Sequence, residues 1–327
     1  MIITQTPFRM SFFGGGTDME DHFREHGGAV LSATIDKYCY VQVRPLPPFF
    51  EYSTEVIYSN TERVSNVSDL RHPLIRNAMQ MMDMHGLRVT YDADLPARSG
   101  LGTSSSFAVG MLNAFYALKG QYASKRKLAD DAIHLERVIC NEAGGWQDQI
   151  AASFGGLNRI DFGPNGYEVN PVIISPERRQ QLNDNLLMFF TGFTRLSSEV
   201  QEMNAKGAPS DKTARLKEMH QLVNEAQEIL TNVSADLDDF GRLLDVTWRL
   251  KKQTGSRIST SVIDEMYMRG MSAGALGGKL LGAGSGGFLV FYVPKEKHEQ
   301  VRRALATLLE IPFSFENNGT KVLYYNM

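Results

Sequence analysis

The stretch of sequence that decides the fold is Pro96-Ala97-Arg98-Ser99-Gly100-Leu101-Gly102-Thr103-Ser104-Ser105-Ser106. The residues before it, 86–95, have the composition of a strand, and the apolar residues after it recur at helical spacing. The first turn of a helix offers unpaired N–H groups and the positive end of the helix dipole, and glycines let the backbone approach a ligand closely. The stretch therefore predicts a loop that binds phosphate. The alternative is an ordinary strand–helix connection with a serine N-cap.

Two further glycine-rich segments, residues 7–18 and 277–287, lie on either side of this loop in the sequence. In the first, a strand of alternating apolar and polar side chains leads into Gly14-Gly15-Gly16-Thr17-Asp18, where we expect a helix to start at Thr17 or Asp18. The second lies between two predicted strands rather than before a helix, which excludes a dinucleotide-binding fingerprint. None of the three segments has the residue spacing of a Walker A loop.

Composition places the chain among ordinary globular proteins. It has 327 residues, 43% of them hydrophobic and 22% charged. Single cores stop growing at roughly 250–300 residues, so we expect two domains, residues 1–180 and 181–327, divided in the polar, proline-containing stretch 163–185. Strands and helices are mixed in both halves, which indicates an α+β fold. The expected strands are 29–44, 51–58, 86–95, 186–192, 278–282, 287–293 and 321–326, and the expected helices are 126–141, 146–153, 216–233, 260–271 and 296–309.

Charge and cysteine content exclude several classes of protein. The formal net charge of −3 argues against a broad basic surface for nucleic acid. Two cysteines are too few for a disulfide-stapled secreted domain. The N-terminus has no secretory signal pattern, and the apolar runs are far shorter than the about 20 residues of a membrane-spanning helix. We therefore expect a cytoplasmic protein that acts on small molecules and has no nucleic-acid or membrane partner.

Two carboxylates stand out by their positions. Asp148 lies at the expected start of a short helix, where the helix dipole favours the ionised form that a general base requires. A purely structural aspartate at a helix start is the alternative. Glu136 lies on the apolar face of the expected helix 126–141, where a carboxylate is costly unless it is paired or binds a metal ion. A buried ion pair between Glu136 and Arg137 is the alternative there.

In their order and spacing, the three glycine-rich segments resemble the three motifs of the GHMP kinases, a family that includes galactokinase, homoserine kinase and mevalonate kinase. The resemblance covers nearly the whole chain. It implies the two-domain GHMP kinase fold, with an N-terminal domain like ribosomal protein S5 and a ferredoxin-like C-terminal domain. It also implies phosphoryl transfer from ATP with Mg²⁺, in which residues 277–287 support the phosphate loop. The residues expected to bind ATP are Arg98, Ser99, Gly100, Leu101, Gly102, Thr103, Ser104, Ser105 and Ser106.

The same resemblance implies roles for single residues. Asp148 would accept the proton of the acceptor hydroxyl, and Arg9 would reach Asp148 and orient that hydroxyl; a surface arginine is the alternative. Glu136 and Ser104 would bind Mg²⁺, which usually takes few protein ligands beside phosphate oxygens. The sugar acceptor would be bound by Gly15, Gly16, Thr17 and Asp18. Galactokinases have Glu and His where this chain has Gly15 and Gly16, which argues against galactose, and a plain N-cap is the alternative for Asp18.

The strings FFGGGTD, residues 12–18, and GGWQDQ, residues 144–149, resemble a branch of sugar kinases that phosphorylate an anomeric hydroxyl. Members that act on D-glycero-D-manno-heptose 7-phosphate match this chain's length better than fucokinases, which are much longer. The product would be the 1,7-bisphosphate used to make nucleotide-activated heptose for surface glycans. The alternatives are another sugar 1-kinase, such as an L-fucose kinase, an ATP-using decarboxylase of the same fold, or an inactive regulator that binds sugar and ATP.

A sugar that already carries a phosphate requires a second anion site, away from ATP. Arginine matches phosphate geometry, so Arg195 in the segment 191–198 is the first candidate for this site. Further candidates are Lys251, Lys252 and Arg257, with ordinary surface charge as the alternative. The polar residues between 59 and 75 are candidates for the adenine pocket.

Overall fold

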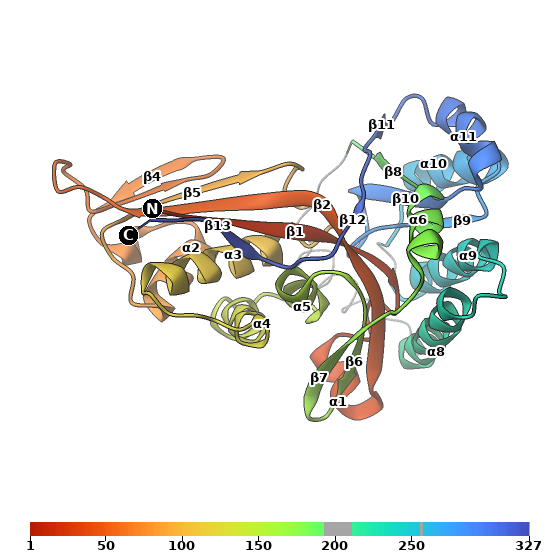
Figure 1. Cartoon of the computed structure of the whole chain (residues 1–327), viewed down its shortest axis with the longest axis horizontal. Coiled ribbons are helices and arrows are strands. Elements are labelled where there is room, and N and C mark those ends of the chain that lie inside the picture. Colours follow the sequence, from red (N-terminus) through yellow and green to blue (C-terminus); the bar gives the residue numbers. More distant parts are fainter. Residues whose placement is uncertain (193–210, 256–257, 327) are drawn as a thin grey trace.

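The protein folds around two β-sheets, and the computed structural model describes residues 1–192, 211–255 and 258–326. The larger sheet has the strand order β13-β1-β2-β5-β3-β4, with β12 and β6 paired to β2 and β7 paired to β6. The smaller sheet has the order β11-β8-β10-β9. The two sheets lie toward opposite ends of the molecule (Figure 1).

The elements have the following bounds. The larger sheet consists of β1 (Ile2–Phe13), β2 (Gly28–Pro45), β3 (Thr54–Ile57), β4 (Thr61–Val64), β5 (Leu87–Ala93), β6 (Leu157–Gly163), β7 (Gly166–Pro171), β12 (Phe315–Glu316) and β13 (Lys321–Tyr325). The smaller consists of β8 (Leu186–Phe190), β9 (Gly277–Leu280), β10 (Phe288–Tyr292) and β11 (Leu309–Glu310). The helices are α1 (Glu20–His26), α2 (Pro73–Met81), α3 (Thr103–Leu118), α4 (Lys125–Ile133), α5 (Gln147–Phe154), α6 (Pro176–Asp184), α8 (Lys212–Thr231), α9 (Asp238–Lys252), α10 (Ser261–Ser272) and α11 (His298–Ala304). Short helical turns are η1 (Val67–Asp69), the π-helical η2 (His134–Ile139) and η3 (Lys295–Lys297).

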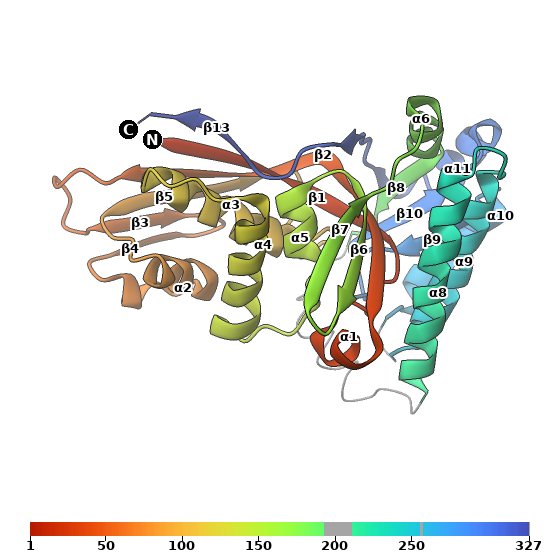
Figure 2. The ribbon, with the colours of Figure 1, turned by 60° about the horizontal axis from the view of Figure 1, so that its bottom comes forward.

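The long strand β2 holds the larger sheet together, because it pairs with β1, β5, β6 and β12. Its first eight residues are all buried, as expected for a strand covered on both faces. Helix α3 packs against β1 and β2 and also touches α4 and α5, so most of its residues are buried. Figure 2 shows α2 to α5 gathered along one side of this sheet, while α8 and α9 run side by side next to the smaller sheet.

Aromatic packing and one lysine join the two sheets. Phe240 of α9 places its ring edge-on to Phe12 and Phe13 of β1, with ring centroids 5.5 and 5.1 Å apart. Lys279 of β9 is buried, and its Nζ donates a hydrogen bond of 2.8 Å to the carbonyl oxygen of Phe12. The end of β1, in the larger sheet, is therefore anchored to α9 and to β9 of the smaller sheet, which fixes the glycine-rich loop that follows it.

The expected α+β fold is confirmed, and most expected strands and helices are present within a few residues of their predicted bounds. Helix α1 begins at Glu20 rather than at Thr17 or Asp18, because Thr17 belongs to a turn in which its N–H and hydroxyl both donate to the carbonyl oxygen of Gly14. Residues 163–185, expected to be a polar boundary, contain β7 and α6, and β13 returns to pair with β1. The division of the chain at residue 180 stays a prediction. Among the described residues, no helix is long and apolar enough to cross a bilayer.

Candidate active site

The predicted phosphate loop connects β5 to the start of α3. Gly100 and Gly102 have φ angles of +87° and +72°, a left-handed conformation that glycine adopts without strain. Two contacts fix the loop to β1: the Arg9 N–H donates to the carbonyl oxygen of Leu101 at 3.1 Å, and the Ser106 hydroxyl donates to that of Pro7 at 2.9 Å. Because α3 begins at Thr103, the loop ends in the first helical turn, whose N–H groups can bind an anion.

The third glycine-rich segment packs directly on this loop. A Cβ atom at Gly282 would lie 2.4 Å from the Gly100 Cα, and one at Gly287 would lie 2.1 Å from the carbonyl oxygen of Ser99. Conversely, a Cβ atom at Gly100 would lie 2.3 Å from the carbonyl oxygen of Leu281. No side chain fits at these contacts, so the two loops require glycine where they touch. The structure thus brings together two segments that are about 180 residues apart in the sequence. This contact agrees with the expectation that residues 277–287 support the phosphate loop.

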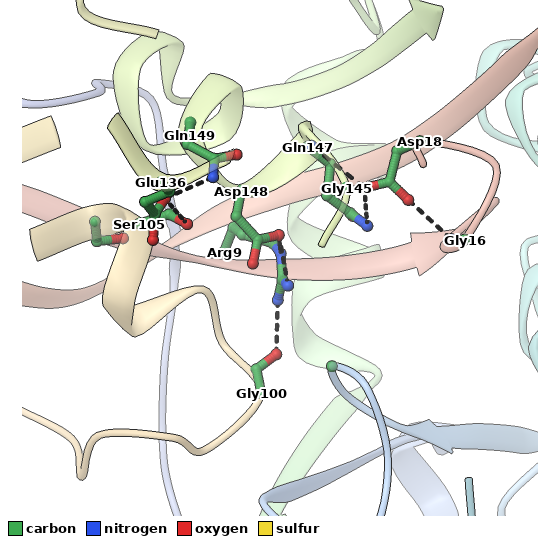
Figure 3. Close-up of polar contacts among 12 residues, drawn as sticks. Arg9, Gly16, Asp18, Gly100, Ser105, Glu136, Gly145, Gln147, Asp148 and Gln149 are labelled. Atoms are coloured by element: carbon green, nitrogen blue, oxygen red, sulfur yellow. Dashed lines mark hydrogen bonds and ion pairs between the residues drawn. The ribbon is translucent and has the colours of Figure 1, made fainter. Parts of the chain in front are cut away.

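Arg9 and Asp148 form the centre of the site. Arg9 is buried on β1, and its Nε and Nη2 lie 2.8 and 2.7 Å from Asp148 Oδ1 (Figure 3). Its Nη1 donates to the carbonyl oxygen of Gly100 at 2.7 Å. Asp148 lies in the first turn of α5, and a Cβ atom at Gly102 would be 3.4 Å from its Oδ2. A partly exposed carboxylate is therefore held by an arginine directly against the phosphate loop.

Glu136 lies in the π-helical turn η2 and is almost fully buried. Its Oε1 accepts from the Ser104 hydroxyl at 3.1 Å, and its Oε2 accepts from the Ser105 hydroxyl at 2.7 Å and from Gln149 Nε2 at 2.5 Å (Figure 3). Arg137, the alternative partner, instead donates to the carbonyl oxygens of Gly145 and Glu142. In the described part of the chain, no three acidic, histidine or cysteine side chains cluster as a complete metal site. One carboxylate beside an exposed serine fits Mg²⁺, since that ion takes most ligands from water and phosphate.

Asp18 is buried between the first glycine-rich loop and α5. Its Oδ1 accepts from the Gly16 N–H at 2.8 Å, and its Oδ2 accepts from the N–H and Nε2 of Gln147 at 3.3 and 3.0 Å. Asp18 does not cap α1, whose N-cap is Met19. Burial raises the pKa of Asp18, and the nearby Asp148 carboxylate raises it further. A Cβ atom at Gly145 would lie 1.9 Å from Asp18 Oδ2, so the loop before α5 closes tightly over this carboxylate.

Two lysines reach the same region although their positions gave no strong signal in the sequence. Lys251, at the end of α9, donates from Nζ to the carbonyl oxygen of Gly282 at 2.6 Å. Burial, together with the charge of Arg9, lowers its pKa to about 8. Lys279 is the second, and burial lowers its pKa well below the ordinary value. The charge of Asp18 acts on both lysines, so the C-terminal half lies close to the first glycine-rich loop.

The candidates for a second anion site are dispersed. Arg195 and Arg257 lie outside the described residues. Lys252 pairs with Asp264 at 3.0 Å, whereas Lys251 lies beside the phosphate-loop support. The segment 59–75 borders a cavity of about 480 Å³ lined by Tyr58, Asn60, Thr61, Glu62, Arg63, Val64, Asp69 and Arg71. A larger cavity of about 860 Å³ lies between α6 and the start of α9 and contains none of the predicted site residues.

Comparisons with known proteins agree with this geometry. The family profile "GHMP kinases N terminal domain" matches residues 71–156, and "GHMP kinases C terminal" matches residues 219–311. The chain is 30% identical to the D-glycero-alpha-D-manno-heptose 7-phosphate kinase of Campylobacter jejuni, over 98% of each chain. It is 26% identical to the bifunctional fucokinase/GDP-fucose pyrophosphorylase of Arabidopsis thaliana, over 92% of this chain but 31% of that protein.

Solved structures give the same assignment. The crystal structure of a D-glycero-D-manno-heptose 1-phosphate kinase from Bacteroides thetaiotaomicron superposes with a TM-score of 0.81 and 25% identity over the whole of both chains. The chain therefore belongs to the GHMP kinases and is a sugar kinase that uses ATP as phosphoryl donor.

Proposed function

We propose that the protein transfers the γ-phosphoryl group of ATP to the anomeric hydroxyl of D-glycero-D-manno-heptose 7-phosphate, giving the 1,7-bisphosphate and ADP. The observation that carries this proposal is the Arg9–Asp148 pair held against Gly100 of the phosphate loop. It sets a potential proton acceptor beside the place where phosphate binds, which is the arrangement that phosphoryl transfer requires. The choice of sugar is supported by the two heptose kinases to which the chain is similar over its full length.

In this mechanism, Asp148 accepts the proton of the anomeric hydroxyl as its oxygen attacks the γ-phosphorus. Arg9 fixes the carboxylate through two donors to Oδ1, which leaves Oδ2 toward Gly102 for the acceptor. A general base of this kind typically contributes about 10²–10⁴-fold to the rate. The phosphate loop holds the triphosphate through backbone N–H groups and the start of α3. Proximity and charge stabilisation then supply most of the remaining acceleration.

Glu136 and Ser104 would hold Mg²⁺, which neutralises phosphate charge when it is bound. The residues around Glu136 support such a role. Ser105 and Gln149 occupy Oε2, so that Oε1 faces the exposed Ser104 at the phosphate-loop end of α3. A buried carboxylate with hydrogen bonds but no arginine or lysine partner in the described chain retains a charge that a cation can balance. For the 7-phosphate, Arg195 stays our proposed contact.

The experiment is a measurement of ADP release with ATP and Mg²⁺ against a panel of acceptors. The panel contains D-glycero-D-manno-heptose 7-phosphate, unphosphorylated heptose, mannose, L-fucose, galactose and mevalonate. We expect the heptose 7-phosphate to have the highest kcat/KM, with turnover on the order of 1–100 s⁻¹. A higher kcat/KM for L-fucose or for a neutral heptose would refute the proposed acceptor.

The variant Asp148→Asn tests the proposed base in the same assay. It keeps the size of the side chain and one oxygen for Arg9, so ATP should bind as before. We expect kcat to fall by about 10²–10⁴-fold. A loss below about tenfold, with unchanged acceptor KM, would show that another group takes the proton.

A further inference from the structure

Lys251 is a partly exposed lysine in the last turn of α9, and its ammonium group lies between two of the glycine-rich segments. Its Nζ donates a hydrogen bond of 2.6 Å to the carbonyl oxygen of Gly282 in the third segment. A Cβ atom at Gly15 in the first segment would lie 3.8 Å from the same nitrogen. Because Gly282 packs on Gly100, the ammonium group is separated from the phosphate loop by a single residue.

The charge of Lys251 is not balanced by an ion pair. Among the described residues it forms no salt bridge, and the carbonyl of Gly282 that accepts its hydrogen bond is neutral. The neighbouring Lys252, in contrast, pairs with Asp264 at 3.0 Å. An ammonium group has three donors, so Lys251 keeps two for a ligand.

The other cations of this region are already engaged. Arg9 directs two of its nitrogens to Asp148 and the third to a carbonyl oxygen of the phosphate loop. Lys279 is buried and donates to the carbonyl oxygen of Phe12. Burial also lowers the pKa of Lys279 well below its ordinary value, which disfavours its charged form. Of these three side chains, Lys251 is the one whose charge and donors remain for an anion.

The position of Lys251 selects that anion. The phosphate loop and the Arg9–Asp148 pair mark the place where the γ-phosphoryl group is transferred, and the charge of Asp148 acts on Lys251. Phosphate oxygens are acceptors, so they match the free donors of an ammonium group. A fixed cation there stabilises the charge that is spread over the transferring group. A phosphate at the far end of a seven-carbon sugar must lie well away from this centre, so Lys251 is poorly placed to bind it.

We infer that Lys251 is a further catalytic residue, which binds the γ-phosphoryl group of ATP with its free donors and stabilises that group during transfer. The inference rests on the transfer centre proposed above at Asp148. The bond from the anomeric oxygen to the γ-phosphorus forms while the bond from that phosphorus to the bridging oxygen of ADP breaks. Asp148 takes the hydroxyl proton, and Lys251 keeps its own. The ammonium group that holds Gly282 thus also supplies charge to the reaction.

The variant Lys251→Met tests this role by nucleotide binding, without any acceptor. It removes the charge and keeps most of the side-chain volume. In the presence of Mg²⁺, we expect the Kd of the β,γ-methylene analogue of ATP to rise at least about tenfold, because a hydrogen bond to a charged group is lost. The Kd of ADP, which has no γ-phosphoryl group, should stay within about twofold of the wild-type value.

The matched control is Lys252→Met, which removes the same charge from the same helical turn. It should change neither Kd, since the charge of Lys252 is matched by Asp264. A displaced phosphate loop would weaken the binding of both nucleotides, because both have phosphates on that loop. An equal rise in the two Kd values of Lys251→Met, or no rise in either, would therefore overturn the inference.

Turnover gives a second readout. The kcat of Lys251→Met should fall by about 10²-fold with every acceptor that the wild type uses. A loss confined to the KM for heptose 7-phosphate would place Lys251 at the remote phosphate and overturn the inference. Wild-type turnover decides the proposed function separately. If L-fucose is the better acceptor, that function fails, and the two Kd values still decide the role of Lys251.

Discussion

Glu136 is a buried carboxylate that is oriented by hydrogen bonds but has no cationic partner in the described chain. Its two oxygens accept three hydrogen bonds, from two hydroxyls and an amide, and all three donors are neutral. Hydrogen bonds of this kind orient a carboxylate but do not cancel its charge, so burial leaves a net cost that a bound cation can offset. This arrangement supports the Mg²⁺ role that we propose for Glu136 at the start of α3.

Glu136→Gln should separate a metal-binding role from a structural one. The amide keeps the size and one acceptor but loses the charge, so we expect the Mg²⁺ concentration for half-maximal activity to rise at least about tenfold. The melting temperature should stay the same or rise, because a buried charge is removed. The control is Glu142→Gln, a nearby acid whose backbone N–H donates to the carbonyl oxygen of Glu136. A marked loss of stability with unchanged Mg²⁺ dependence would indicate a structural carboxylate.

The sequence alone indicated residues that stand out within their own segment. It did not indicate residues whose environment is formed by distant parts of the chain. Glu136 was identifiable because a carboxylate interrupts an apolar helix face, and Asp148 because it begins a helix. The environment of Lys251 and Lys279 could not be predicted in this way. Lys279 bonds to a residue 267 positions away, and helical or strand periodicity contains no information about such a contact.

The pKa of Lys251 predicts an alkaline limit to activity. Burial and Arg9 lower it to about 8 from the ordinary 10.5, against the opposing effect of Asp18 and Asp148. If the ammonium binds the γ-phosphoryl group, kcat/KM for ATP should fall as the pH rises through about 8. The stability contribution has the opposite sign. The folded state binds fewer protons than the unfolded chain between pH 8 and 10.5, so the cost that this buried lysine adds to folding disappears as the pH rises over that range.

Because activity should fall while stability rises with pH, measuring both tests whether Lys251 is the group that titrates. Activity and melting temperature are followed together from pH 6 to about 10, in wild type and in Lys251→Met. We expect the wild type to lose activity above about pH 8 without losing stability. The residual activity of Lys251→Met should show no such loss. If activity falls at the same alkaline pH in both proteins, a group other than Lys251 titrates.

At the level of elements, the site is built where two loops meet without side chains between them. The phosphate loop and the loop between β9 and β10 touch backbone to backbone at Gly100, Gly282 and Gly287. Each loop alone is an unremarkable connection between regular elements. Their contact fixes the carbonyl of Gly100 that Arg9 uses, so the C-terminal half helps to position the Arg9–Asp148 pair that we propose as catalytic.

Gly282→Ala should therefore act on ATP rather than on the sugar. Its Cβ atom would lie 2.4 Å from the Gly100 Cα, a distance that requires one loop to move. We expect the KM for ATP to rise at least tenfold, and overpacking of this kind typically costs about 1–3 kcal/mol of stability. Gly86→Ala is the control for backbone strain, since Gly86 has a φ of +66° with no atom within 4 Å. Equal effects of both variants on ATP would show that strain alone is responsible.

At the level of the whole molecule, the end of the chain returns to support its beginning. After the smaller sheet, β12 and β13 pair with β2 and β1, so the larger sheet is completed by residues from both ends of the sequence. Figure 1 places both chain ends at the same side of this sheet. Local patterns predicted the strand near residues 321–326 but could not assign its partner, because edge pairing depends on the three-dimensional path of the chain.

The turn before β13 also contacts the helix that carries Asp148. The Thr320 N–H donates to the carbonyl oxygen of Ala152 at 2.8 Å, and the Thr320 hydroxyl lies 2.8 Å from that of Thr6 on β1. A Cβ atom at Gly319 would lie 2.0 Å from the carbonyl oxygen of Ser153. This turn thus packs against the C-terminal end of α5 and bonds to β1, so both side chains that we propose as catalytic, Arg9 on β1 and Asp148 on α5, depend on its position.

Gly319→Ala should consequently impair catalysis from a position far from the substrate. The methyl group cannot be accommodated against the backbone of α5, so α5 or the turn must shift, and a displacement of about 1 Å at the base can cost about 10²-fold in rate. We expect kcat to fall with little change in the KM for ATP, accompanied by a lower melting temperature. Gly163→Ala adds the same methyl group in open space and should leave both unchanged. If Gly319→Ala lowers stability while kcat at a permissive temperature equals that of wild type, the turn supports the fold alone, and the position of Asp148 is set entirely within the N-terminal elements.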